Sequence, residues 1–166
     1  MPERPVVSTQ RRTLYSPAER VRRDASRWTI VQGALAPLQF LVFLVSLALV
    51  CRYLATGEGL AAATVSIVAK TCLLYAIMVT GSIWEKAVFG RWLFAPAFFW
   101  EDVVSMGVIA LHTAYLVALF RGLEPGVQIA IALAAYASYA VNAAQFLLKF
   151  RAARLETRPV ALESAP

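Results

Sequence analysis

The chain has 166 residues, a net charge of +6 and 60% hydrophobic residues, against about 45–50% in soluble proteins. Its mean hydropathy is +0.63, and long stretches between residues 28 and 150 carry almost no charge. These values exclude an ordinary soluble domain and indicate an all-α integral membrane protein with one domain. Most basic residues lie in tails beside apolar segments, which favours contact with membrane lipid and argues against nucleic acid.

The first 27 residues form a basic tail with seven arginines and no apolar run. This pattern does not fit a signal peptide, so we expect the first apolar segment to be retained as a membrane span. Ser16 to Glu19 has the pattern of a capping box, with proline at the first helical position. We therefore expect a short basic helix here, lying at the membrane surface.

Four apolar segments follow, and each is close to the length that crosses a bilayer as a helix. The predicted transmembrane helices are residues 28–50, 61–84, 103–120 and 127–148. Short connections at Gly57–Gly59 and Glu124–Gly126 separate the first and last pairs, which predicts two antiparallel hairpins. The sequence thus predicts a four-helix bundle, followed by a C-terminal tail at 151–166.

The distribution of lysine and arginine predicts the orientation. Thirteen of these residues lie in the N-terminal tail, in the connection at 85–102 and in the C-terminal tail. Only Arg52 and Arg121 lie near the other connections. Under the positive-inside rule, both termini and the 85–102 connection are cytoplasmic.

Each predicted span carries a row of polar side chains on one helical face, and we expect these rows to face one another because lipid cannot satisfy them. Interhelical hydrogen bonds, worth about 0.6 kcal/mol each, are the expected role of several of them. That group is Gln32, Gln39, Thr64, Thr71 and Ser138. Lys70 is expected to snorkel to the outer interface.

Residues 88–103 combine aromatic rings with charged groups. The six rings are Phe89, Trp92, Phe94, Phe98, Phe99 and Trp100. An interfacial aromatic belt favours Trp and Tyr, whereas four of these six are Phe and none is Tyr. The composition therefore favours a cytoplasm-facing pocket for a large, flat, apolar ligand.

Glu85, Glu101 and Asp102 mark the cytoplasmic ends of the second and third spans. They can be interface residues, with Asp102 capping the third helix. Alternatively, they converge beside the rings, where repulsion in a partly dry site favours retention of a proton by one of them. His112, the only histidine, fits a proton carrier, an axial ligand or a satisfied core group.

The segment TGSIWEKAVFGRWLFAPAFFWEDVVSMGVIALHTAYL at 80–116 resembles the 3-vinyl (or 2-vinyl) bacteriochlorophyllide hydratase family of bacteriochlorophyll biosynthesis. The resemblance continues through 35–50, 52–59 and 139–149. It implies a hydro-lyase of the bacterial inner, or photosynthetic intracytoplasmic, membrane. Its reaction would add water to the C3-vinyl group of chlorophyllide a or 3-vinyl bacteriochlorophyllide a, giving a 1-hydroxyethyl group. No cofactor of the protein is implied, because the magnesium belongs to the substrate.

The resemblance also implies roles for individual residues. Glu101 or Glu85 would donate the proton, and Asp102 would orient water or stabilise positive charge. Arg91 or Lys86 would pair with the substrate propionate, although a headgroup-facing Arg91 is the alternative. The macrocycle would lie against rings from Trp84, Trp92, Phe94, Phe98, Phe99 and Trp100. Groups expected near the magnesium are His112, Asn142 and Gln145, with Tyr115 relaying protons or merely packing.

Two other functions are compatible with the same features. A non-catalytic pigment-binding or handover protein would need the rings but not the acids. A small transporter is disfavoured, because broken helix pairs are missing from the sequence. A homo-oligomer, or association with other pigment-synthesis enzymes, is compatible with the hydratase hypothesis.

Overall fold

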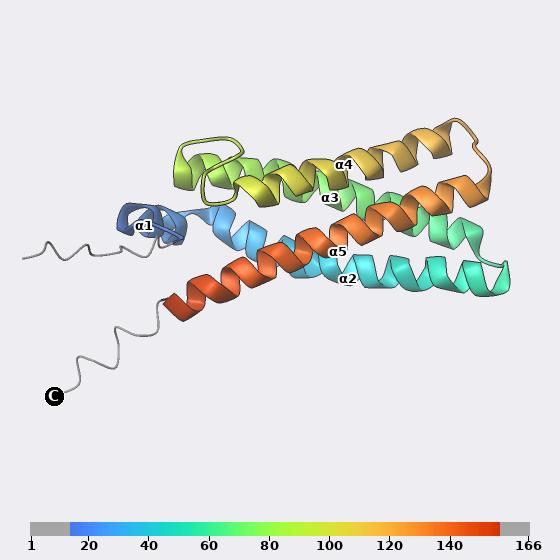
Figure 1. The fold of residues 1–166 in the computed structure, drawn as a ribbon, viewed down its shortest axis with the longest axis horizontal. Coiled ribbons are helices and arrows are strands. Elements are labelled where there is room, and N and C mark those ends of the chain that lie inside the picture. Colours follow the sequence, from blue (N-terminus) through green and yellow to red (C-terminus); the bar gives the residue numbers. More distant parts are fainter. Residues whose placement is uncertain (1–13, 157–166) are drawn as a thin grey trace, which may run out of the picture.

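A computed structural model describes residues 14–156, and its helices are shown in Figure 1. This part of the chain contains five helices and no strand, so the predicted all-α class is confirmed. The helices are α1 (Pro17–Ala25), α2 (Arg27–Thr56), α3 (Leu60–Phe89), α4 (Phe99–Phe120) and α5 (Pro125–Glu156). The outer parts of the two predicted tails, 1–13 and 157–166, lie outside the described residues.

Helices α2 to α5 are each long and apolar enough to cross a membrane. All four extend past the predicted spans: α2 to Thr56, α3 to Phe89 and α5 to Glu156, while α4 begins at Phe99 rather than at residue 103. Hydrophobicity marks only the part of a helix that matches the hydrocarbon layer, so it misses turns that extend beyond it. The start of the predicted C-terminal tail, residues 151–156, is accordingly helical.

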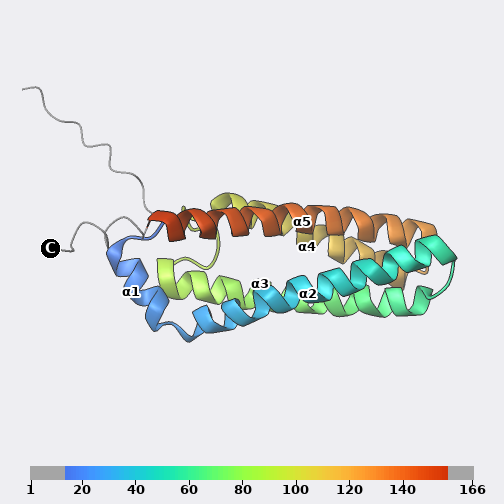
Figure 2. The ribbon, with the colours of Figure 1, turned by 90° about the horizontal axis from the view of Figure 1, so that it is seen from below.

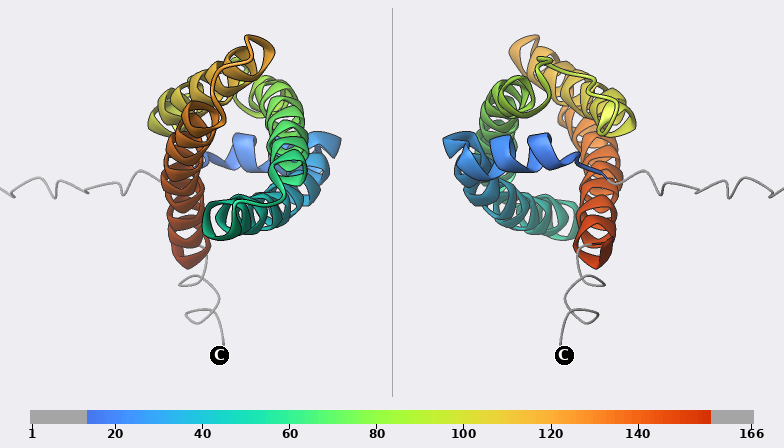
Figure 3. Two further views of the ribbon diagram at one scale, coloured as in Figure 1. Left: turned by 90° about the vertical axis from the view of Figure 1, so that its right-hand side faces the viewer. Right: turned by 90° about the vertical axis from the view of Figure 1, so that its left-hand side faces the viewer.

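Helices α2 and α3 form one hairpin and α4 and α5 form another, as predicted. Figure 2 shows the two hairpins running side by side, and Figure 3 shows the four long helices arranged around a common axis. Gly57 and Gly59 adopt φ angles of 74° and 86° in the first connection, a conformation that favours glycine. The connection of this hairpin lies at the end of the bundle opposite α1 (Figure 1).

Helix α1 begins with the predicted capping box. The Ser16 Oγ accepts from the Glu19 N–H at 3.3 Å, and the Glu19 carboxylate accepts from the Ser16 N–H at 2.7 Å. The helix lies across one end of the bundle, beside the connection between α3 and α4 (Figures 1 and 3). Its capping signal was readable from sequence because it is local.

Tyr15 anchors this end of the chain. Its ring is 4% exposed, stacks on Phe89 with centroids 5.8 Å apart, and lies 6.3 Å from Phe98. Arg23 lies over the same ring, 4.8 Å from its centroid. Burial raises the pKa of Tyr15 to about 12, so the hydroxyl stays neutral at physiological pH.

Removing this ring should release α1. We expect Tyr15→Ala to cost roughly 3–5 kcal/mol of local packing, as for other large buried aromatic side chains. Trypsin should then cleave at Arg20 and Arg22 at least ~10-fold faster than in the wild-type protein, because α1 opens more often. Tyr15→Phe keeps the stacked ring and should retain protection. Equal cleavage rates for Tyr15→Ala and wild type would contradict the anchoring role.

Several polar rows face one another, as expected. The Gln32 amide donates to Thr80 Oγ1 at 2.7 Å between α2 and α3, and Ser46 lies 2.7 Å from Ser66 and 2.5 Å from the Tyr136 hydroxyl. These contacts join α2 to α3 and α5. The interior of the bundle is therefore polar at several levels rather than uniformly apolar.

Three predicted interhelical hydrogen bonds are wrong. The Thr71 hydroxyl donates to the Ile67 carbonyl, and the Ser138 hydroxyl donates to the Ala135 carbonyl, each within its own helix. Short hydroxyl side chains can satisfy themselves this way one turn back along a helix. The buried Gln39 amide has no hydrogen-bond partner among the described residues. Helical periodicity predicts the face of a residue but not its partner.

Candidate functional site

The connection between α3 and α4 has an irregular backbone. Gly90 ends α3 with a φ angle of 79°, which suits glycine. Phe94 has a φ angle of 58°, which costs a residue with a side chain about 1–2 kcal/mol. The surrounding contacts must therefore hold this conformation in place.

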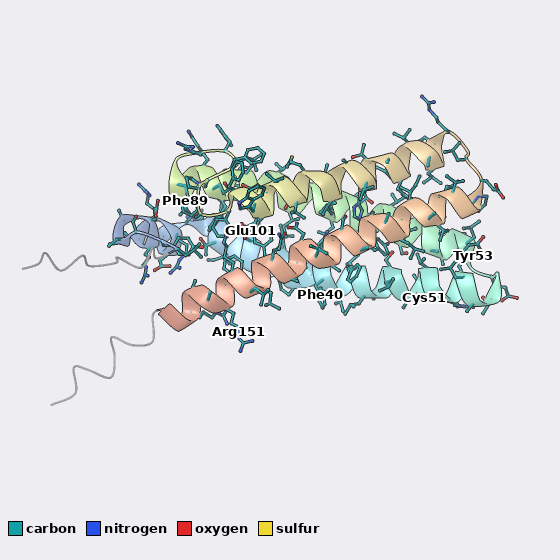
Figure 4. All side chains as sticks on the ribbon, in the orientation of Figure 1. Phe40, Cys51, Tyr53, Phe89, Glu101 and Arg151 are labelled. Atoms are coloured by element: carbon teal, nitrogen blue, oxygen red, sulfur yellow. The ribbon has the colours of Figure 1, made fainter. Side chains whose placement is uncertain are left out.

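Ionisable side chains from three helices hold the connection. Glu85 of α3 accepts from the Ala95 N–H at 3.1 Å, and Asp102 of α4 accepts from the Phe94 N–H at 2.7 Å. Lys149 of α5 donates to the Ala97 carbonyl. Figure 4 shows Glu101 and Phe89 at this end of the bundle, with Cys51 and Tyr53 toward the other.

Asp102 does not cap α4, so that alternative is wrong. The helix begins at Phe99, Phe98 occupies the N-cap position, and no side chain bonds the first turn. Asp102 instead turns back to bond the connection before the helix. The negative charge still lies in the first helical turn, where the helix dipole favours it.

Glu85 and Asp102 form a carboxyl pair. The two residues are 5% and 4% exposed, and their carboxylates accept from the adjacent backbone N–H groups of Ala95 and Phe94. Two ionised carboxylates this close together repel each other where water is largely excluded, which favours a proton on one of them. The structure thus brings these two acids together at the end of the bundle.

Glu101 bonds a partner that sequence analysis did not identify. The Lys149 ammonium donates to its carboxylate at 2.5 Å, and the Glu101 side chain is 9% exposed. Lys149 also lies near Asp102. A signal existed, because Lys149 continues the polar row of α5 one turn beyond Gln145. This cation beside Asp102 leaves Glu85 as the acid more suited to hold the shared proton.

A second group of polar side chains lies one turn deeper. The Asn142 amide donates to Ser105 Oγ at 2.8 Å, joining α5 to α4. The Asn142 Oδ1 and the Gln145 Oε1 are buried and accept no hydrogen bond from the residues that the structure describes. Both predicted residues thus present unused acceptors inside the bundle, a suitable environment for a bound water.

The six rings of the connection separate into two groups. Phe89 and Phe98 pack with Trp84, Tyr15 and Phe146 in a small core, where Phe98 is 1% exposed. Trp84 also donates its indole N–H to Thr29 at 3.0 Å. The other four are exposed on the surface of the bundle: Trp92, Phe94, Phe99 and Trp100. We call these four the surface rings.

Arg91 and Lys86 lie on the outside of this end. Arg91 is exposed, and the exposed Lys86 donates to the Gly90 carbonyl at 2.9 Å, near the C-terminus of α3. Tyr115 lies elsewhere: it is fully buried on α4, with its hydroxyl beside Thr64. The structure therefore does not bring Tyr115 or Arg91 together with the carboxyl pair.

Lys70 does not snorkel to the interface, contrary to expectation. Its side chain is fully buried, and its ammonium lies 3.3 Å from His112 Nε2. His112 Nδ1 lies 2.8 Å from the Val108 carbonyl, so it is the nitrogen that carries the hydrogen. Nε2 is then an acceptor for Lys70, and His112 can approach a magnesium only if Lys70 moves away.

No group of three His, Cys, Asp or Glu side chains is arranged to hold a metal ion within residues 14–156. What the fold and the site define is a helical membrane protein with a buried pair of carboxyl side chains at one end. An acid of this kind, beside a cation and buried amides, is suited to general acid–base chemistry.

The comparisons with known proteins name the family. Residues 15–152 match the family described as 2-vinyl bacteriochlorophyllide hydratase, and the chain belongs to it. A protein named 2-vinyl bacteriochlorophyllide hydratase from Cereibacter sphaeroides is 71% identical over 145 residues, covering 87% of this chain and 91% of that protein. One of the same name from Rhodobacter capsulatus is 65% identical over 156 residues, covering 94% and 91%. No solved structure matches the chain.

Proposed function

We infer that this chain is a hydratase that adds water to the vinyl group of a bacteriochlorophyllide in bacteriochlorophyll biosynthesis. Family membership supports the reaction, and the Glu85–Asp102 carboxyl pair is the observation that supports its chemistry. Hydration of a vinyl group must begin with a proton, and we propose that this buried pair supplies it. We propose chlorophyllide a and 3-vinyl bacteriochlorophyllide a as its substrates.

Glu85 is the proposed proton donor. Its proton passes to the terminal carbon of the vinyl group, and positive charge develops on the inner carbon, where the conjugated macrocycle spreads it. Asp102 accepts the hydrogen bond from Glu85 and, as a carboxylate, stabilises the positive charge. Lys149 already donates to the Glu101 carboxylate, so Glu101 has a supporting position in this scheme.

Water then attacks the inner carbon. We propose that Asn142 and Gln145 hold this water, because each presents a buried carbonyl oxygen without a hydrogen-bond partner among the described residues. The attacking water gives one of its two protons to the carboxyl pair and keeps the other as the product hydroxyl. This transfer restores the starting protonation state of the pair. The product carries a 1-hydroxyethyl group, and one water molecule has been consumed.

The surface rings are proposed to meet the pigment first. Trp92, Phe94, Phe99 and Trp100 are exposed beside the connection that Asp102 holds. A flat macrocycle can stack on such rings before its vinyl edge moves to the carboxyl pair. Trp84 and Phe98 contribute indirectly, since their packing with Tyr15 fixes the base of the connection.

The proposed orientation places this end of the bundle in the cytoplasm. The arginines of α1, Lys86, Arg91 and Lys149 all lie at it, whereas Arg52 and Arg121 lie toward the other end. We propose that the four long helices cross the bacterial inner membrane and that both termini are cytoplasmic. Cysteine labelling from each side of the membrane would test this topology.

Incubation of the purified protein with chlorophyllide a tests the function. Hydration removes the vinyl group from conjugation, so we expect the long-wavelength absorption of the extracted pigment to move to the blue and its mass to increase by one water. A pigment-binding or handover protein would return the pigment unchanged. Unchanged pigment from folded protein that binds it would therefore contradict catalysis and favour that rival.

A further inference from the structure

Lys70 lies in a polar and aromatic environment that the hydration chemistry does not use. Its ammonium lies 3.7 Å from the centroid of the Tyr139 ring, 5.6 Å from that of Tyr136 and 5.8 Å from that of Phe43. We call these three rings the aromatic cage. His112 accepts from the ammonium on another side. The cation on α3 is thus surrounded by groups from the other three long helices, α2, α4 and α5.

Lys70 lacks a counter-ion. Among the residues that the structure describes, no carboxylate lies within ion-pair distance of the Lys70 ammonium, although the side chain is fully buried. Rings and a neutral imidazole offset only part of the cost of burying an ammonium. An ammonium has three hydrogen-bond donors and His112 accepts one, so donors remain for an anionic ligand.

A second observation points to a ligand between Lys70 and the carboxyl pair. Gln39 is 2% exposed, and neither its amide oxygen nor its amide nitrogen has a partner among the described residues. Phe43 and Tyr139 are in contact, with centroids 4.9 Å apart. Gln39 lies one turn from Phe43 on α2, and Asn142 lies one turn from Tyr139 on α5, each toward the α1 end. The two amides therefore lie at about the same distance along the axis of the bundle.

Polar side chains therefore recur along the interior of the bundle. The carboxyl pair lies at the α1 end, the unpartnered amides of Gln39, Asn142 and Gln145 come next, and Lys70 with His112 follows. On α4, Asp102 and His112 are ten residues apart, which corresponds to about 15 Å of helix rise. A pigment bound between the hairpins would extend over this length from its reacting edge.

We propose that Lys70 binds the free carboxylate of the substrate, with His112 and the aromatic cage positioning its ammonium. The proposal rests on the proposed function, because a bacteriochlorophyllide differs from an esterified pigment by this free propionate. With the vinyl group at the carboxyl pair, the propionate points along the amides toward Lys70. Lys70 then selects free acids, whereas Arg91 and Lys86 on the outer surface do not contribute to this selection.

Equilibrium binding of two unreactive pigments tests the proposal. One is chlorophyllide a with its vinyl group reduced to ethyl, and the other is the methyl ester of the same compound. Quenching of tryptophan fluorescence reports the Kd of each. We expect the wild-type protein to bind the acid at least about 30-fold more tightly, as is typical when one partner of a buried charged pair is removed. Lys70→Met should bind both pigments with the weak affinity that the wild type shows for the ester.

Three further variants keep the test decisive. Lys70→Arg retains a cation with several donors and should keep the preference for the acid, which guards against a misfolded Lys70→Met. Arg52→Gln removes a cation at the other end of the bundle and should behave as wild type. Equal wild-type affinities for acid and ester, or loss of preference in Arg91→Gln but not in Lys70→Met, would overturn the proposal. Failure of the hydration assay is scored separately on vinyl pigments and concerns the proposed function.

Discussion

Glu85→Gln is expected to lower turnover of chlorophyllide a by roughly 100-fold to 10,000-fold, the usual range for loss of a general acid. The amide can still accept from the Ala95 N–H, so the hydrogen bond of the carboxyl to the connection survives. What disappears is a proton acidic enough to transfer to carbon. Pigment affinity should change little, because the variant keeps the size and polarity of the side chain.

Matched controls separate this loss from misfolding. Asp102→Asn should also lose activity, since an amide cannot stabilise the developing positive charge as a carboxylate does. Glu58→Gln alters an exposed acid in the connection at the opposite end and should retain full turnover. Helical content and thermal unfolding in detergent would be compared for all three. Full activity in both Glu85→Gln and Asp102→Asn would exclude the carboxyl pair from the chemistry.

Local sequence signals were sufficient to predict much of the fold. The capping box at Ser16 and the glycines at 57 and 59 act through their immediate neighbours, so the sequence alone was sufficient to place them. The hairpins followed from short connections. Because successive membrane spans alternate in direction, the end of α3 and the start of α4 lie on the same side, which is why Glu85 and Asp102 were expected to meet.

Helical periodicity in the sequence could not predict the contacts between side chains of different helices. Lys70 is near the middle of α3, and a snorkelling side chain was a reasonable expectation for a lone cation in an apolar helix. The residues that hold it inward, His112, Tyr136 and Tyr139, belong to α4 and α5. A helical period gives the face of a residue, but not which residue of another helix lies opposite.

The aromatic segment shows the same limit in another form. Its composition predicted that six rings form one pocket for a flat ligand, but composition cannot predict how a connection folds. The bonds from Glu85 and Asp102 to the backbone turn Phe98 into the small core with Tyr15 and leave Phe94 at the surface. The acids therefore shape the connection as well as supplying the proposed chemistry, which sequence gave no means to recognise.

Lys149→Met is expected to lower the stability of the whole bundle. It leaves the Glu101 carboxylate in a nearly buried position without its cation, and removes the donor to the Ala97 carbonyl. Loss of one partner of a fully buried pair costs about 3–5 kcal/mol. Because the Lys149 side chain is 25% exposed, we expect a smaller cost, of roughly 2–3 kcal/mol. The measurement is thermal unfolding in detergent, followed by helical circular dichroism.

The double variant Glu101→Gln/Lys149→Met distinguishes an unpaired charge from simple loss of packing. With both charges gone, most of the stability should return, because the cost lies in the uncompensated carboxylate and not in the missing attraction. Arg151→Met removes an exposed cation from the same helix and should unfold like the wild type. A double variant no more stable than Lys149→Met would assign the loss to packing and to the Ala97 carbonyl instead. In that case Lys149 would hold the connection between α3 and α4 chiefly through its hydrogen bond to the Ala97 carbonyl, and Glu101 would contribute little to the stability of the site.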